Sequence, residues 1–195
     1  MPLHTVVTPE LFLEVHSASV EALLPLADRD WTAPSANPGW SCADTVAHLA
    51  DAYFAHAGRI VAQPDAGFVP GEVRPDEGAG VAELLQLLSA CAGLVAAAGL
   101  SADPESRAWH PWGTSDPEGS LAMAAAEGLL HTWDVTSALG SDWRPPSALC
   151  SPVLDRLFPD APNVDPTEAL LWCTGRTALD DAPRLASWRW WSAVR

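Results

Sequence analysis

The sequence contains no lysine, and all ten of its basic residues are arginines. The lack of lysine excludes Schiff-base chemistry and a phosphate-binding loop of the Walker type, because both need a lysine. Acidic residues number 25, so the formal net charge is −15. A surface of that charge repels nucleic-acid phosphates and anionic lipid headgroups. We therefore expect a small-molecule substrate and no nucleic-acid or membrane partner; a homodimer stays open.

Cysteine is scarce, and no two cysteines form a CxxC pair. Such cysteines are typical of buried thiols in a reducing compartment. The N-terminus has no basic stretch followed by an apolar core, so it does not resemble a signal peptide. We expect a cytoplasmic protein with four unpaired thiols, at Cys42, Cys91, Cys150 and Cys173.

The longest apolar stretch runs from Leu84 to Leu100 and is marginal in length for a membrane span. Gln86 and Ser89 interrupt it, and its flanks are acidic where a membrane helix favours basic residues. We interpret this stretch as a buried helix of a soluble bundle.

No stretch shows the alternation of a strand, whereas several segments repeat apolar residues at helical spacing. The fold prediction is an all-α four-helix bundle with additional short C-terminal helices and a Trp-rich tail. With 195 residues, the chain is expected to form one domain over residues 1–195. The predicted helices cover residues 8–26, 42–61, 81–98, 116–139, 148–158 and 165–175.

Several helix ends carry recognisable signals. Thr8 and Asp116 each precede a proline, as at a capped N-terminus. Ser41 with Asp44 forms a pattern like a capping box. Gly99 is expected to end the third long helix, because glycine is common just beyond a helix.

Tryptophan is abundant outside the predicted helices. Trp109 and Trp112 flank His110 in a long loop, where they either line the mouth of a site or anchor the loop on the bundle. Trp188 and Trp190 lie two residues apart near the C-terminus, so both project from one face of an extended segment. We expect this tail, with Trp188, Trp190 and Trp191, to pack back on the bundle.

Glu127 and His131 lie four residues apart in an apolar helix, so a carboxylate and an imidazole share one face. Burying both is costly unless they form a hydrogen-bonded ion pair or bind a metal ion. His48 lies beside the apolar stripe of the second helix, as a ligand or a core histidine, and His56 is a weaker candidate. Two histidines and one carboxylate suffice for zinc and equally form the facial triad of iron oxygenases.

Three sequence blocks resemble the DinB-like proteins, and in particular the N-terminal domains of mycothiol-dependent maleylpyruvate isomerases. The block from Trp40 to Ala50 resembles the W-s-v-x-D-v-v-a-H-L signature. The block from Glu127 to Gly140 resembles E-x-x-x-H-x-W-D-x-x-x-A-x-G, and the block from Asp165 to Arg176 resembles D-P-x-x-x-L-L-x-x-x-G-R. Their order and spacing make the resemblance far more specific than any one block.

The resemblance implies a DinB-like four-helix bundle with a divalent metal held by His48, Glu127 and His131, usually zinc, with nickel or iron as alternatives. In the thiol-dependent relatives, a low-molecular-weight thiol such as mycothiol binds the metal, loses its proton and attacks an electrophile. The expected activity is therefore that of a thiol-dependent transferase or isomerase with His48, Glu127 and His131 as catalytic residues. A metal-water hydrolase and a non-catalytic metal-binding or regulatory module remain the alternatives. Thr132, where the family often has arginine, departs from the pattern.

Two further residues have open roles. Asp134, one turn after His131, either orients a ligand or forms a structural pair with an arginine. Arg176 is predicted to bind the cofactor by anchoring a carboxylate on the thiol or substrate, although a salt bridge to the acidic surface explains it at least as well.

Overall fold

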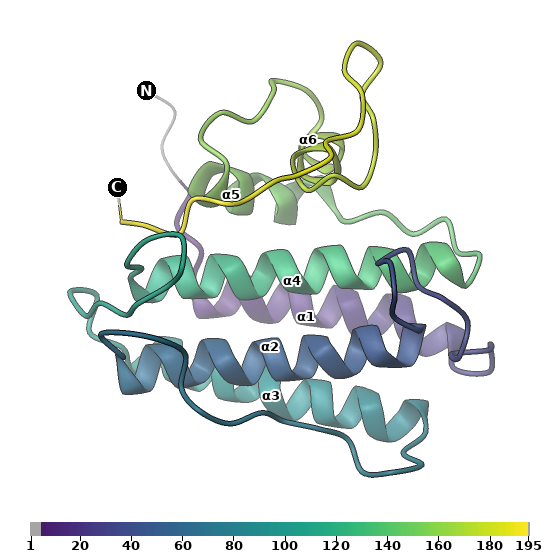
Figure 1. The fold of residues 1–195 in the computed structure, drawn as a ribbon, viewed down its shortest axis with the longest axis horizontal. Helices are drawn as coiled ribbons and strands as arrows, with labels where there is room; N and C mark the ends of the chain where they lie inside the picture. Colours follow the sequence, from purple (N-terminus) through teal and green to yellow (C-terminus); the bar gives the residue numbers. More distant parts are fainter. Residues whose placement is uncertain (1–4, 195) are drawn as a thin grey trace.

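Four long helices lie side by side, and two shorter helices cover one side of them in a computed structural model that describes residues 5–194 (Figure 1). Within these residues there is no strand, only three isolated bridges. The prediction of an all-α bundle with short C-terminal helices is confirmed. The helices are α1 (Pro9–Leu23), the 3-10 helix η1 (Leu24–Leu26), α2 (Cys42–Ala62), α3 (Val81–Ser101), α4 (Pro117–Ala138), α5 (Ser147–Leu157) and α6 (Pro166–Cys173).

Helix α4 is the centre of the packing. It contacts α1, α2 and α3 within the bundle and α5 on its other side. A helix surrounded in this way needs apolar side chains on nearly all of its faces, and small ones allow close packing. The run Ala124–Ala125–Ala126 is fully buried. The central position of α4 means that most of its polar side chains, such as His131 and Asp134, are buried and need a partner.

The helix starts follow the predicted capping signals. The Ser41 side chain accepts from the Asp44 backbone N–H, and the Asp44 side chain accepts from the Ser41 N–H, which completes a capping box. The Asp116 side chain accepts from the N–H of Gly119 at the start of α4. Because Pro25 cannot donate to a helical hydrogen bond, α1 gives way to the 3-10 turn that contains it.

The prediction that Gly99 ends the third helix is wrong, because α3 continues to Ser101. A Cβ atom at this position would lie 3.0 Å from Pro9 and 3.1 Å from the Leu121 side chain. The glycine therefore permits α3 to approach the starts of α1 and α4 closely. Close packing rather than helix termination explains it.

Helix α3 alone among the described helices is long and apolar enough to cross a membrane. Its residues Leu84, Leu88 and Val95 are buried in the core, and the helix packs against α2 and α1. α3 is thus partly buried core and no clear membrane span. All four cysteines are unpaired and buried, as expected.

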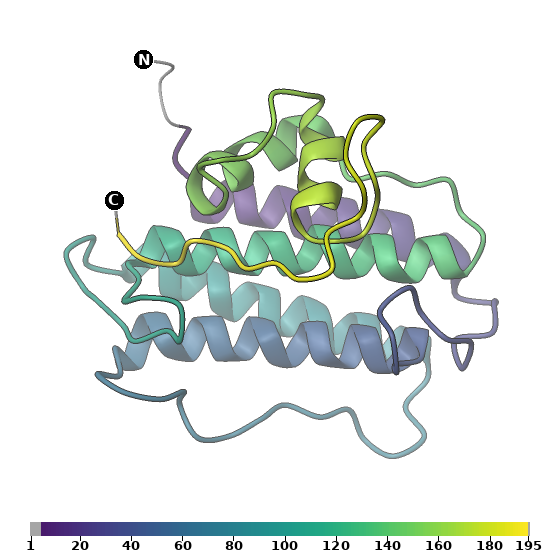
Figure 2. The same cartoon turned by 45° about the horizontal axis from the view of Figure 1, so that its top comes forward.

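The C-terminal segment runs back along α4 after α6 (Figure 2). The Trp191 N–H donates to the carbonyl of Leu157 at the end of α5, over 2.7 Å. Trp190 is buried and Trp188 is half-buried, whereas Trp191 is exposed. The prediction that the tail packs on the bundle therefore holds for Trp188 and Trp190 but is wrong for Trp191, whose side chain turns outward.

Gly128 provides a test of the packing around α4. A Cβ atom there would clash with the hydroxyl of the buried Tyr53 and lie 3.1 Å from Val15. We expect Gly128→Ala to lower the free energy of unfolding by about 1–3 kcal/mol through overpacking, measured by urea denaturation. Gly93→Ala is the control, because that glycine lies in α3 with open space around its Cβ position. The control should gain about 0.5–1 kcal/mol. A Gly128→Ala protein as stable as the parent would contradict this packing.

Candidate metal centre

Three side chains from two facing helices meet between α2 and α4. His48 lies on α2, and Glu127 and His131 lie one turn apart on α4. One ligand atom of each residue lies within 4.8 Å of the others. The structure thus brings together the three residues that the sequence predicted as ligands, and their role as ligands and catalytic residues stays a prediction. Two imidazoles and a carboxylate form a group that can hold a metal ion.

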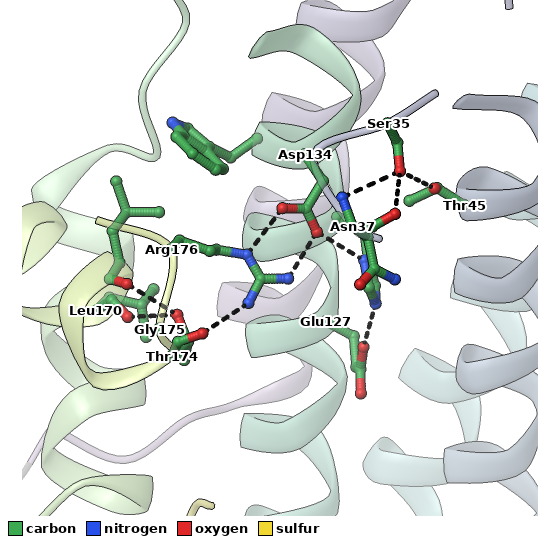
Figure 3. A network of polar contacts seen from close by, with 12 residues as sticks. Ser35, Asn37, Thr45, Glu127, Asp134, Leu170, Thr174, Gly175 and Arg176 are labelled. Atoms are coloured by element: carbon green, nitrogen blue, oxygen red, sulfur yellow. Dashed lines mark hydrogen bonds and ion pairs between the residues drawn. The ribbon is translucent and has the colours of Figure 1, made fainter. Parts of the chain in front are cut away.

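Hydrogen bonds hold His131 on both sides of its ring. Its Nε2 lies 2.8 Å from Glu127 Oε2, and its Nδ1 lies 3.1 Å from Asp134 Oδ2. Arg176 in turn donates to both carboxylate oxygens of Asp134, over 2.9 Å from Nε and 2.6 Å from Nη2 (Figure 3). Asp134 therefore orients the histidine and forms a structural pair with an arginine at once. A carboxylate on the far nitrogen of a ligating histidine is the usual support for a metal site.

The charges of this group depend strongly on one another. Burial lowers the pKa of His131, but hydrogen bonds to Asp134 and Glu127 outweigh burial and raise that pKa above its ordinary value. Burial raises the pKa of Glu127, yet the hydrogen bond from His131 brings that pKa below its ordinary value. For His48 burial dominates and lowers the pKa, which favours the neutral imidazole. Without a metal ion, a proton on His131 Nε2 is therefore shared in the hydrogen bond to Glu127. A metal ion would take the place of that proton.

A cavity of about 320 Å³ opens onto the three residues. Its wall combines the loop before α2, the groove between α2 and α4, and the segment after α6. The ring of Trp40 lies 4.4 Å from the His48 ring and 6.2 Å from the His131 ring, centroid to centroid. A small molecule that enters the cavity would thus contact both imidazoles next to the indole ring of Trp40.

Arg176 lines this cavity, but its guanidinium is already engaged. Besides its two bonds to Asp134, it donates from Nη1 to the carbonyl of Thr174 over 3.4 Å. The predicted role in binding a cofactor is not tested by this arrangement. A salt bridge is present, but its partner is the buried Asp134 and not the acidic surface that the alternative explanation named.

Sequence reasoning missed the contribution of Arg184, which also lines the cavity together with Trp188 and Trp190. No motif contains this arginine, and an isolated arginine in a loop gives no functional signal. Only the expectation that the tryptophan-rich tail packs on the bundle pointed toward this wall.

The loop between α3 and α4 lies outside the cavity wall, and its aromatic residues anchor it. Trp109 packs at right angles to Phe68, with centroids 5.4 Å apart. Trp112 packs on Trp190 at 5.5 Å. Of the two predictions for this loop, anchoring on the bundle and its tail is the one that the contacts support.

His56 belongs to a separate buried cluster and is not one of the three grouped side chains. Its Nδ1 lies 3.2 Å from Nη1 of Arg59, and the Arg59 guanidinium lies 5.4 Å from the centre of the Phe68 ring. Burial, and then the nearby Arg59, lower the pKa of His56 to about 3 and that of His110 to about 4. Both histidines are therefore neutral in the folded protein near pH 7.

This cluster predicts a loss of stability in acid. Between pH 6.5 and about 3 the unfolded chain protonates His56 while the folded protein does not, so stability falls as pH falls through this range. Each such group contributes up to about 1.4 kcal/mol per pH unit. Besides Arg59 and His110, the group that faces His56 is Glu127 on α4. We expect His56→Gln to reduce this slope in urea unfolding between pH 4 and 7; an unchanged slope would contradict the buried, neutral state.

The chain matches the sequence model of a known protein family. The sequence model described as mycothiol maleylpyruvate isomerase N-terminal domain matches residues 12–136, which include His48, Glu127 and His131. No curated protein and no solved structure matches the chain. The block from Asp165 to Arg176 lies outside the match, so its resemblance stays a prediction. Because the match spans well over half of the sequence, the chain belongs to the mycothiol maleylpyruvate isomerase N-terminal domain family.

Proposed function

We propose that this protein is a metal-dependent enzyme that activates a low-molecular-weight thiol, such as mycothiol, for transfer to a small electrophile or for its isomerisation. The observation that carries this proposal is the meeting of His48, Glu127 and His131 on the wall of one cavity. Membership of a family named for maleylpyruvate isomerase supports the choice of a thiol reaction. The proposal includes a cytoplasmic location, because a reducing compartment keeps such a thiol reduced.

The residues present fit a divalent metal. Nitrogen and carboxylate oxygen donors suit zinc first and also nickel or iron, and Asp134 already accepts from the Nδ1 side of His131, which leaves Nε2 on the Glu127 side. When bound, a metal would lower the pKa of a thiol or water molecule bound to it. His48, Glu127 and His131 would hold the ion, while Arg176 keeps Asp134 in place.

The chain's own thiols do not supply the nucleophile. All four cysteines are buried, and burial raises the pKa of Cys150 to about 12 and that of Cys173 to about 11. None of the four lies among the residues that line the cavity. An external thiol is therefore the source of sulfur in this proposal, and the cavity provides its place.

The metal predicts a simple composition test. Purified protein should contain about one divalent ion per chain, as expected for one site with three protein ligands, and EDTA should lower its melting temperature. His48→Ala should lose the ion, measured by elemental analysis. His16→Ala is the matched control, because His16 lies on α1 and bonds Ser89 at 3.2 Å. Metal-free parent protein, with melting unchanged by EDTA, would refute the metal centre.

The thiol reaction predicts a second test. With mycothiol or N-acetylcysteine and 1-chloro-2,4-dinitrobenzene, sulfur displaces chloride from the ring carbon and the thiol proton leaves to solvent. We expect His48→Ala and His131→Ala to lower this rate by more than about 100-fold, since even the outer partners of metal ligands typically account for 10- to 100-fold.

Circular dichroism should show the helical bundle in both variants, so that loss of activity reflects the site. Activity that survives in either variant would contradict the assignment of ligands. Metal binding without any thiol reaction would instead favour the hydrolase or the non-catalytic binding module.

A further inference from the structure

The segment after α6 forms one wall of the cavity. Arg184, Leu185 and Ala186 line it, followed by Trp188 and Trp190. All of these residues lie beyond the part of the chain that matches the family, residues 12–136. The chemistry of this wall is therefore a property of this chain that family membership does not supply.

Arg184 is the cation of this wall that has no carboxylate partner. Its Nε donates to the backbone carbonyl of Gly175, and within residues 5–194 no carboxylate pairs with it. Arg176, the other arginine of the cavity, is paired with Asp134 through two hydrogen bonds. The anchored Nε leaves both Nη groups of Arg184 for a ligand, and two parallel N–H donors match the two oxygens of a carboxylate.

The charge around the cavity differs from that of the whole chain. Two carboxylates, of Glu127 and Asp134, and two guanidiniums, of Arg176 and Arg184, line it, whereas the formal net charge of the chain is −15. A divalent ion at the three ligands would make this cavity positive. An anion in solution would then be drawn to the cavity and repelled by the rest of the surface.

Trp188 and Trp190 complete the wall with flat apolar surface. Their ring centroids lie 5.5 Å apart. The volume of about 320 Å³ limits a ligand on this wall to a small molecule.

We propose that the cavity selects a small ligand with a carboxylate, and that Arg184 is the residue that determines this specificity while the indoles of Trp188 and Trp190 flank the ligand. This inference deepens the proposed function, on which it rests for the reaction, by naming the chemical class of one reactant. The carboxylate belongs either to the electrophile or to the thiol.

Binding of benzoate and of benzamide to the metal-free protein tests the proposal apart from any reaction. The two molecules have nearly the same shape, and only benzoate carries the anion. Chemical shifts of the tryptophan indole N–H groups in NMR titrations give the dissociation constants. We expect benzoate to bind more tightly than benzamide, and Arg184→Gln to weaken benzoate about tenfold, the loss of about 1.4 kcal/mol, with little effect on benzamide.

Arg189→Gln is the matched control, because Arg189 lies in the same exposed segment but does not line the cavity. It should bind benzoate like the parent, and Arg184→Lys should recover part of the affinity. Equal benzoate affinity in Arg184→Gln and the parent would overturn the proposal. So would parent protein that binds benzoate no better than benzamide, or does not bind it at all.

Cobalt-substituted protein locates the carboxylate, because sulfur bound to cobalt absorbs light. If Arg184→Gln weakens 3-mercaptopropionate but not 2-mercaptoethanol, the carboxylate is on the thiol. If Arg184→Gln binds both thiols as the parent does but binds benzoate more weakly, the carboxylate is on the electrophile. If no thiol reaction is found but benzoate binding still depends on Arg184, the proposed function is refuted and this inference stands.

Discussion

The pairing of Asp134 with Arg176 is the interaction on which the cavity depends. The Asp134 side chain is 1% exposed and that of Arg176 is 11% exposed. Removing two such charges from water is costly unless good geometry and further hydrogen bonds compensate. Here the guanidinium donates to both carboxylate oxygens, and Oδ2 also lies 3.1 Å from His131 Nδ1. One carboxylate therefore joins the end of α6 to α4 and orients the histidine of the candidate metal centre.

This pairing also determines where the tail begins. Just before Arg176, Gly175 has φ +66°, and a Cβ atom there would lie 2.8 Å from the carbonyl oxygen of Leu185. The chain turns at this glycine, and the backbone at Leu185 passes so close to it that a side chain has no room. Arg184 then donates to the Gly175 carbonyl. The ion pair, the turn and the anchored arginine together place the tail over the groove between α2 and α4.

Local signals in the sequence were enough to predict the long helices and the pairing of Glu127 with His131, whereas the family resemblance added His48 as the third residue. The capping box at Ser41 and the spacing of Glu127 and His131 depend only on neighbours within a turn or two, so a linear sequence contains them. Gly99 misled because its role depends on Pro9 and Leu121, residues that are distant in sequence. Trp191 turns outward although its neighbours pack inward, since the alternation of an extended segment sends successive side chains to opposite sides.

The candidate site therefore divides into two parts of different origin. The family match contains all three ligand candidates but ends before Arg176 and the tail. The match therefore bears on the proposed metal and on the proposed activation of a thiol, because both rest on His48, Glu127 and His131. It does not constrain which molecule lies beside them, since Arg184, Trp188 and Trp190 line the same cavity from outside the match. Family membership narrows the chemistry that we propose for this protein, whereas the choice of substrate in that proposal depends on the cavity-lining residues of the C-terminal segment.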